Sequence, residues 1–400
     1  MTDLFWPGDG RADDIFTDAA FLAAMVVVEN AWLDVLVDAG VAPADARANL
    51  TAEVSAADVG LISVGAEADG NPVIGLVALL RERASETTAR WLHRGLTSQD
   101  VLDTALMLCL RDALSRIRAE ISTQVRALAG LVESHHQTPM VAHTLTQPAL
   151  PSMVGARMAT WLAGVLDAAD TLAGLPGQPV QAGGAAGTLA ATTELTGSPQ
   201  AALALADSLA TALALAPATP WHTTRSVITR TGDAFVTCCD AWGHIANDVA
   251  AGSRAEIGEL AEGRGGRSST MPHKNNPVMS VLIRRAALTA PQLGAALHSA
   301  SAASVDERSD GGWHAEWATL RTLTRHTVVA ASHTSELLSG LKIDTDRAEA
   351  NLAAAGDLLA EQRSMAELTG RRALPGYTGA TDHLVDAALQ RARHHLKEVT

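Results

Sequence analysis

Aromatic residues are scarce in this chain of 400 residues: Phe, Trp and Tyr together make up 3% of it, and there is one tyrosine. Apolar residues nevertheless make up 47%, so the core must be built mainly from Ala, Leu, Val and Ile. Such side chains favour closely packed helices, and no stretch alternates convincingly as a strand. We therefore predict an all-α protein, with two or three domains or one extended helical body.

Cysteine and positive charge are also in short supply. The three cysteines, Cys109, Cys238 and Cys239, have the spacing of neither a disulfide framework nor a zinc site, which favours a cytoplasmic protein. Because the formal net charge is −14 and no long basic block occurs, we do not expect nucleic acid as a partner. The acidic N-terminus lacks the pattern of a secretory signal, and no apolar run predicts a membrane span.

Sequence patterns typical of metal and cofactor sites are absent. The adjacent pairs His135–His136 and His394–His395 point apart on a helix, so they do not have a chelating spacing. Neither a P-loop nor a GxGxxG motif after a strand occurs. We expect no metal and no cofactor.

Helical periodicity runs through most of the chain. Apolar positions from Ile15 to Leu36 recur at spacings of three to five residues, as on one face of a helix. Several predicted helices are long enough to suggest a bundle that partner subunits could complete. The other predicted helices cover Asp100–His135, Leu150–Leu175, Ala201–Ala216, Thr231–Leu260 and Val278–Ser304.

The segment from 262 to 277, EGRGGRSSTMPHKNNP, is predicted to be a loop with a chemical role. Its prolines end any helix, and its glycines at positions 263, 265 and 266 allow positive φ angles. Ser268, Lys274 and Asn276 offer a hydroxyl, a cation and an amide within nine residues, which suits a carbanion and carboxylates. The alternative is a flexible surface linker, which this combination of residues disfavours.

A second candidate segment precedes the helix predicted from Asp100. Thr97 and Ser98 are natural N-cap residues, and a capping turn alone would explain Ser98 and Asp100. A helix N-terminus with two free hydroxyls and exposed N–H groups also suits a carboxylate, and His93 adds a donor one turn upstream. The residues alone leave both interpretations open.

Three further segments interrupt the helical pattern with polar residues. Residues 138–151 are interpreted as a helix–helix connection, and residues 221–225 as the opening of a helix whose Trp221 packs in the core. Residues 306–317 place an acidic and a basic residue before a Gly–Gly break. An ion pair at a helix end explains these two residues at least as well as a substrate contact. The polar residues concerned are His143, Thr144, Gln147, Arg225, Glu307 and Arg308.

Together these segments resemble one superfamily, the aspartase/fumarase lyases, whose loop motif is G-S-S-x-M-P-x-K-x-N-P. Within it, the chain is most similar to the 3-carboxy-cis,cis-muconate cycloisomerase branch, which serves protocatechuate breakdown in the β-ketoadipate pathway of aromatic catabolism. The branch is indicated by TSQDVLDTALML at 97–108, GGAAGT at 183–188 and WHAEW at 313–317. The loop motif is matched at Ser268, Ser269, Met271, Pro272, Lys274, Asn276 and Pro277.

The resemblance implies a homotetramer around a long central helix bundle, with active sites shared between subunits and a polycarboxylate substrate. The N-terminal, central and shortened C-terminal domains would cover residues 1–92, 93–337 and 338–400. Ser268 would be the catalytic acid/base on a loop that closes over the substrate, and Lys274 would stabilise the aci-carboxylate intermediate. The implied substrate-binding residues are His93, Thr97, Ser98, Thr144, Gln147, Arg225, Asn276 and Arg308.

One departure from the superfamily pattern bears on the chemistry. Leu145 stands where lyases that release amines hold a histidine as general acid. An amine leaving as an anion is prohibitively basic, whereas a carboxylate leaving group has a pKa near ~4 and needs no proton. Leu145 therefore favours a cycloisomerase, in which a carboxylate adds to a double bond and the reverse reaction expels it. His143 could in principle replace the missing acid.

Other departures and alternatives stay open. Arg267, Asn275 and Thr224 each stand where the superfamily commonly has another residue. The alternatives are another superfamily lyase that eliminates fumarate from a succinyl substrate, and a catalytically silent homologue. Intact Ser268 and Lys274 argue against the silent homologue.

Overall fold

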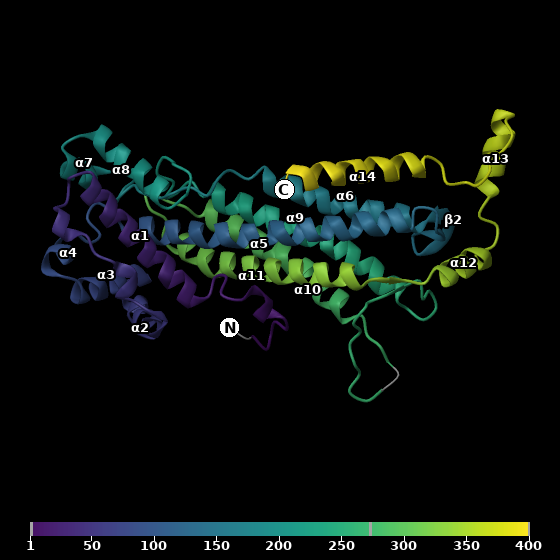
Figure 1. The fold of residues 1–400 in the computed structure, drawn as a ribbon, viewed down its shortest axis with the longest axis horizontal. Coiled ribbons are helices and arrows are strands. Elements are labelled where there is room, and N and C mark those ends of the chain that lie inside the picture. Colours follow the sequence, from purple (N-terminus) through teal and green to yellow (C-terminus); the bar gives the residue numbers. More distant parts are fainter. Residues whose placement is uncertain (1–2, 272–273, 399–400) are drawn as a thin grey trace. The chain divides into compact units, whose positions relative to one another are not determined.

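The computed structural model describes residues 3–271 and 274–398, and most of them are helical (Figure 1). The all-α prediction is confirmed, and most of the helices predicted from periodicity lie close to those observed. The helix predicted over Thr231–Leu260 is displaced, because α9 begins at Ser226 and ends at Gly252. With a rise of 1.5 Å per residue, the 37 residues of α5 span about 55 Å. The longer helices are α1 (Asp18–Asp38), α5 (Ser98–Ser134), α6 (Val154–Ala173), α9 (Ser226–Gly252), α10 (Val278–Ala302) and α11 (Gly311–Gly340).

Shorter helices complete the chain. They are α2 (Val59–Asp69), α3 (Pro72–Arg83), α4 (Glu86–Trp91), α7 (Ala190–Thr196), α8 (Pro199–Ala212), α12 (Thr345–Ala354), α13 (Ala360–Thr369) and α14 (Thr381–Glu398). Side chains fix several of their first turns, as where Asn71 accepts a hydrogen bond from the backbone N–H of Val73 and Pro72 occupies the first turn of α3.

The chain divides into two compact units, each with its own core. Unit 1 comprises Met1–Arg116, Leu175–Asp233 and Gln292–His326, and unit 2 comprises Ile117–Gly174, Ala234–Pro291 and Thr327–Thr400. Four of the boundaries fall inside α5, α9, α10 and α11, and the fifth directly follows α6. The three-domain division expected from the sequence stays a prediction.

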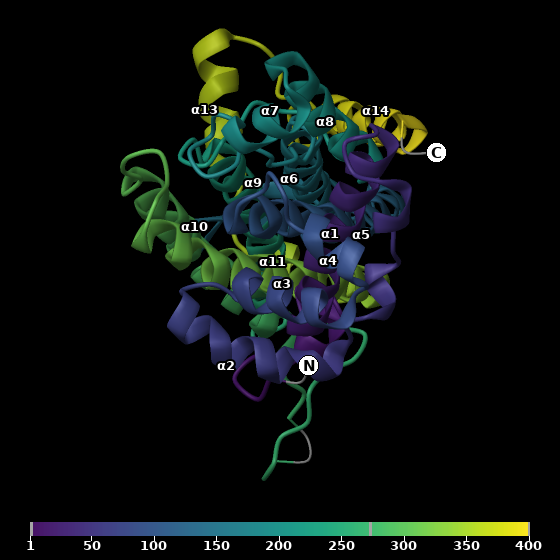
Figure 2. The ribbon, with the colours of Figure 1, turned by 90° about the vertical axis from the view of Figure 1, so that its left-hand side faces the viewer.

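In unit 1, α1 packs against α8, and α2, α3 and α4 gather near it (Figure 2). Trp32, Leu33 and Leu36 on α1 are buried, together with Leu76 and Leu80 on α3. Among the described residues, α1 alone is long and apolar enough to cross a membrane, but half of that window is buried inside the protein, as in a core helix.

In unit 2, α14 lies along α6 (Figure 1). Arg391 on α14 forms ion pairs of 2.7 and 2.6 Å with Asp167 and Asp170 on α6. The core of the unit contains the fully buried Trp242, whose indole N–H donates to Gln124 Oε1 at 2.7 Å. Because this donor is satisfied, the large ring can be buried without the cost of an unpaired polar group.

Residues 138–151 connect α5 to α6, as predicted, but the expectation that no strand occurs there is wrong. They lie in an antiparallel hairpin of β1 (Pro139–Thr144) and β2 (Gln147–Met153). Leu145 and Thr146 form its turn with φ angles of 49° and 71°, the left-handed pair that suits a tight hairpin. Two prolines in β2 hid this short strand from the sequence pattern. A second pair joins β3 (Leu260–Ala261) and β4 (Lys342–Ile343).

The glycine pair at residues 311–312 does not break a helix but begins α11. A Cβ atom at Gly312 would lie 2.7 Å from the backbone oxygen of Ala300, so a larger residue would not fit. The glycine therefore serves close packing, which the sequence pattern could not distinguish from a turn.

Candidate active site

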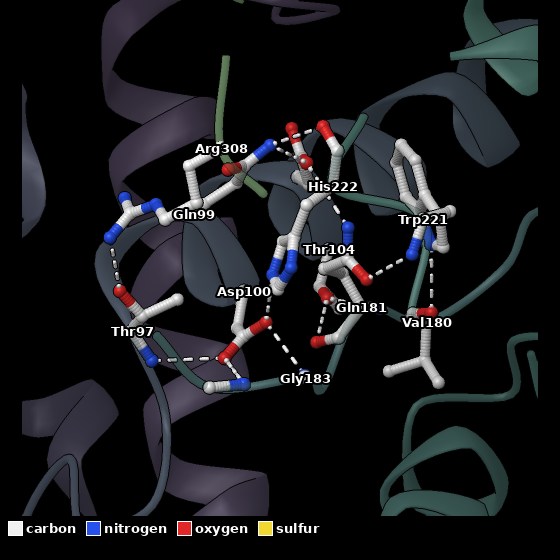
Figure 3. Close-up of polar contacts among 12 residues, drawn as sticks. Thr97, Gln99, Asp100, Thr104, Val180, Gln181, Gly183, Trp221, His222 and Arg308 are labelled. Atoms are coloured by element: carbon white, nitrogen blue, oxygen red, sulfur yellow. Dashed lines mark hydrogen bonds and ion pairs between the residues drawn. The ribbon is translucent and has the colours of Figure 1, made fainter. Parts of the chain in front are cut away.

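The turn before α5 brings together two of the predicted binding residues, both in unit 1 (Figure 3). Arg308 Nη1 donates to the hydroxyl oxygen of Thr97 at 2.9 Å. The backbone N–H of Thr97 donates to Asp100 Oδ2 at 2.9 Å, which is one of the two hydrogen bonds of a capping box. Ser98 begins α5. This arrangement holds a hydroxyl, a cation and a helix N-terminus at one place, which suits an anionic ligand.

Asp100 is the centre of this arrangement, and it is completely buried. Its Oδ1 accepts from the backbone N–H of Gly183 and lies 2.9 Å from His222 Nε2, whereas its Oδ2 accepts from Gly184 and Thr97. Four polar groups from three segments therefore converge on one carboxylate (Figure 3). Asp100 therefore connects the start of α5 to the GGAAGT motif at 183–188 and to His222, which precedes α9.

His222 was not among the predicted site residues, although it lies in the segment 221–225, which was predicted to open a helix. Its side chain is 3% exposed, and its Nδ1 is buried without a hydrogen-bond partner among the described residues. A Cβ atom at Gly183 would lie 2.7 Å from His222 Cε1. The glycine of the GGAAGT motif therefore leaves room for this ring, and the motif and the segment 221–225 together are the sequence signal for the contact.

Trp221, next to His222, is hydrogen-bonded to the segment that precedes Gly183. Its indole N–H donates to Val180 O at 3.0 Å, and its backbone N–H donates to Gln181 Oε1 at 2.9 Å. Gln181 is tied in turn to α5, because Thr104 exchanges hydrogen bonds with its backbone. Trp221 is a buried packing residue, as predicted.

Arg225 is buried and its guanidinium is not accessible to a ligand. Its Nε, Nη1 and Nη2 all donate to Asp103 or Glu316, and its side chain is fully buried. Burial alone would lower the pKa of Arg225, but the two carboxylates raise it above its usual range. Burial raises the pKa of Glu316, and Arg225 opposes that shift. The guanidinium offers no exposed donor in the described chain, so its predicted substrate contact finds no support here.

His93 lies in the turn between α4 and α5, and its backbone is in the left-handed region, with a φ of 63°. Its Nδ1 lies 2.6 Å from Oε1 of Glu29, a fully buried residue of α1. Glu29 was not predicted as part of the site. The signal was present, because Glu29 follows Val28 on the apolar face predicted from Ile15 to Leu36, where a charged residue is unexpected.

The loop of residues 262–277 belongs to unit 2 and has no helix among its described residues, as predicted. Gly266 and Asn276 pair through both backbone N–H groups at 2.8 and 2.9 Å, which closes the loop at its base. Ser268 Oγ accepts from the backbone N–H of Met271 at 3.1 Å, and Lys274 is exposed. Pro272, which forms part of the motif, lies outside the described residues.

The glycines of this loop serve a purpose other than the predicted one. Gly263 and Gly266 do not have positive φ angles. A Cβ atom at Gly263 would lie 2.4 Å from the backbone oxygen of Gly340, and one at Gly266 would lie 2.1 Å from Val278 Cγ2. These residues are glycine because neighbouring atoms approach too closely for a side chain.

Glu262 secures the end of the loop where α10 begins. Its carboxylate accepts from the backbone N–H groups of Met279 and Ser280 at 3.0 and 2.7 Å, and from the Ser280 hydroxyl at 2.7 Å. A carboxylate at a helix N-terminus is favourable because it satisfies free N–H groups and the helix dipole. The first residue of the loop is therefore bonded to the helix that follows the loop.

Thr144 and Gln147 are brought together because they are partners in the hairpin register. Leu145 is 96% exposed at the tip between them, and His143 lies one register position away, opposite Pro148. Among the described residues no acidic or basic side chain bonds to Thr144 or Gln147; the amide of Gln147 bonds to the hydroxyl of Thr146 at 3.4 Å. The hairpin tip offers amide and hydroxyl groups beside an apolar residue.

The cysteines are poor candidates for nucleophiles. All three are buried, and burial raises the pKa of Cys109 and of Cys239 to about 12 and that of Cys238 well above its usual range. Among the described residues, no group of three or more His, Cys, Asp or Glu side chains could hold a metal ion.

Comparison with known proteins assigns the family. The Lyase family matches residues 24–291, which is more than half of the chain. The chain belongs to the aspartase/fumarase superfamily. A nitrosuccinate lyase of Streptomyces davaonensis is 43% identical over 88% of this chain and 77% of its own length. A 3-carboxy-cis,cis-muconate cycloisomerase of Bradyrhizobium diazoefficiens is 38% identical over 96% of this chain and 85% of its own.

Solved structures of the superfamily have the same fold. A 3-carboxy-cis,cis-muconate lactonizing enzyme from Pseudomonas putida superposes with a TM-score of 0.82 at 28% identity, covering 96% of this chain and 97% of that one. A fumarate lyase from Mesorhizobium sp. BNC1 gives a TM-score of 0.80 at 28% identity, covering 97% and 87%. These structures agree with the superfamily assignment. The relatives are named for different substrates, nitrosuccinate and 3-carboxy-cis,cis-muconate among them.

Proposed function

We propose that this enzyme forms or breaks a bond at the carbon β to a carboxylate, and that the departing group is already a stable anion. The observation that carries the proposal is Leu145, 96% exposed at the tip of the β1–β2 hairpin. The resemblance implies that lyases that release amines hold a histidine general acid at this position. A leaving group that needs no proton can depart without such an acid.

The first candidate reaction is the one that the sequence motifs favour, the lactonisation of 3-carboxy-cis,cis-muconate to 4-carboxymuconolactone. One carboxylate oxygen forms a bond to a carbon of the double bond, and the adjacent carbon takes up a proton. In reverse, Ser268 removes that proton and the ring carboxylate leaves as an anion. Support comes from the relatives of this name, which match nearly the whole chain.

The second candidate is elimination from nitrosuccinate, which the 43% identical relative favours. Removal of a proton from the carbon next to the C–N bond, followed by cleavage of that bond, gives nitrite and an unsaturated dicarboxylate. Nitrite, like a carboxylate, is a stable anion, so Leu145 is compatible with this reaction too. The same Ser268 and Lys274 would manage the carbon proton and the aci-carboxylate.

The residues assigned to binding of the substrate carboxylates are His93, Thr97, Ser98, Thr144, Gln147, Asn276 and Arg308. Support for Thr97 and Arg308 comes from the hydrogen bond between them, which places a hydroxyl and a cation side by side. A homotetramer with shared active sites is part of the proposal.

The test is a parallel assay of the purified enzyme with 3-carboxy-cis,cis-muconate, nitrosuccinate and adenylosuccinate, following absorbance and nitrite. Turnover of either of the first two, with none of adenylosuccinate, supports the proposal, and the ratio of the two kcat/KM values selects the substrate. Cleavage of adenylosuccinate alone would overturn it. Ser268→Ala should lower kcat at least ~100-fold, the usual scale for a positioned proton-transfer group.

A further inference from the structure

His314, in the WHAEW motif, links the first turn of α11 to the turn between α2 and α3. Its Nδ1 lies 2.9 Å from the backbone oxygen of Asp310, and its Nε2 lies 2.9 Å from the backbone oxygen of Gly70. Gly70 ends α2 in the left-handed conformation, with a φ of 73°, as glycine commonly does at the end of a helix. One ring therefore joins two elements of unit 1 that lie far apart in the sequence.

Both partners of the His314 ring are carbonyl oxygens, which can only accept hydrogen bonds. A neutral imidazole has one N–H group and can satisfy one of the two contacts, whereas an imidazolium has two and satisfies both. In the neutral ring, a nitrogen lone pair would face a carbonyl oxygen at 2.9 Å. The geometry therefore requires the charged form of the ring.

Two indole rings lie beside His314 and favour a positive charge. The centroid of the His314 ring is 4.6 Å from that of Trp317 and 5.3 Å from that of Trp313, within the range of a cation–π interaction. The dipole of α11 opposes the charge, because His314 lies in the first turn of this helix. The two carbonyl oxygens and the indoles must outweigh that dipole.

The charged groups around the ring come from α11, α2 and α1. Asp310 directly precedes α11, Asp69 is the last residue of α2, and Asp18 of α1 pairs with Arg321 of α11 at 2.8 Å. This ion pair and His314 line the same small cavity, to which α5 contributes Leu106. Because the charge of Arg321 is balanced by Asp18, the remaining carboxylates make the surroundings acidic, which also favours a positive ring.

The element that His314 holds is otherwise weakly packed. Of the 11 residues of α2, Ile62 is the buried one, whereas Leu61 and Val64 are 65% and 80% exposed. An element that buries little apolar surface opens locally at a small cost in free energy. A hydrogen bond from a charged donor to the turn at its end therefore adds appreciably to its stability.

We propose that His314 is a protonation-dependent clamp, which holds the α2–α3 turn against the start of α11 while the ring carries both protons. Loss of either proton removes one of the two hydrogen bonds, so the ring is no longer fixed between the carbonyls and the turn is held less firmly. A histidine in an unfolded chain loses one ring proton near pH ~6.5. Because the closed clamp binds that proton, it is strongest at low pH and weakens as the pH rises. The clamp involves none of the residues assigned to the substrate, so it does not depend on the proposed function.

A neutron crystal structure of the whole enzyme tests the protonation state. At about pH 7, where a free histidine is mostly neutral, His314 should carry deuterium on both Nδ1 and Nε2. A single deuteron on a ring that keeps both carbonyl contacts would overturn the proposal.

Hydrogen exchange measures how firmly the turn is held. In the wild-type enzyme, the amide groups of residues 62–76 should be protected about 10-fold more at about pH 6 than at about pH 8.5, after correction for intrinsic rates, as expected for one hydrogen bond to a charged group. His314→Phe keeps a ring without donors and should have the lower protection at both pH values. His298→Phe is the matched control and should behave as the wild type, because His298 is exposed and bonds through one nitrogen to Asp233 at 2.9 Å.

Equal protection at the two pH values in the wild-type enzyme would refute the clamp, as would wild-type protection in a folded His314→Phe enzyme. If His314→Phe does not fold, wild-type exchange and the neutron structure still decide the question. Neither measurement uses a substrate, so a failure of the proposed function leaves both tests intact.

Discussion

His222 Nε2 lies 2.9 Å from Oδ1 of Asp100, and both side chains are buried beneath the turn that holds Thr97. The same carboxylate accepts three backbone N–H groups, so each of its oxygens has two polar partners. The carboxylate ties the first turn of α5 to the GGAAGT motif at 183–188 and to the segment 221–225.

Asp100→Asn should destabilise the protein and weaken substrate binding. In either orientation the new amide N–H₂ faces two groups that include a backbone donor, so at least one hydrogen bond becomes a repulsion. We expect a loss of about 3 kcal/mol in the free energy of unfolding, measured with urea. Asp112→Asn, at an exposed position of the same helix, should change it by less than about 0.5 kcal/mol. Equal stabilities of the two variants would contradict the role of Asp100.

Arg225→Met should be among the most destabilising substitutions in unit 1. It leaves Asp103 and Glu316 buried without their counter-charge, a change that costs about 3–5 kcal/mol. Arg225→Lys should also destabilise, because one ammonium group cannot satisfy two carboxylates in the planar geometry of a guanidinium. The measurement is the urea midpoint at constant slope, and a lysine variant as stable as the wild type would refute the structural role.

Leu145→Asn should preserve turnover and stabilise the hairpin. Asparagine tolerates the left-handed conformation better than leucine, so we expect a gain of about 1 kcal/mol or less. Under the proposed function no acid is needed at this position, so kcat should stay within about threefold of the wild-type value. Thermal unfolding and steady-state kinetics check the two parts separately. A 100-fold loss of kcat would show that Leu145 itself takes part in the reaction.

The pH dependence of stability should include a contribution from Asp58. The Arg83 side chain, followed by the backbone N–H of Ser55, lowers the pKa of Asp58 from 3.8 to about 2. A lowered pKa in the folded protein means that the stabilisation is present above the unfolded value and is lost as the pH falls toward 2. The difference in unfolding temperature between wild type and Asp58→Asn should be constant above about pH 5 and shrink below it. A difference that does not vary with pH would contradict this assignment.

Much of the fold follows from local sequence pattern. The helices α5 and α10 start and end close to their predicted limits, because apolar periodicity, caps and prolines act over a few residues. The β1–β2 hairpin escaped prediction because its turn uses Leu145 and Thr146 rather than Asn–Gly. The role of Gly312 escaped it because close packing against Ala300 depends on how α10 and α11 meet in space, which no local pattern shows.

The sequence by itself determined the superfamily, through a loop motif whose spacing does not depend on what surrounds it, and it identified Leu145 as the departure that bears on the leaving group. Only the tertiary structure decided what the charged residues do. Arg225 and Glu29 are both charged residues near candidate motifs, yet one neutralises buried carboxylates and the other faces a single ring nitrogen. The physical reason is that burial and partners set the behaviour of a charge, and both arise from segments far apart in the chain.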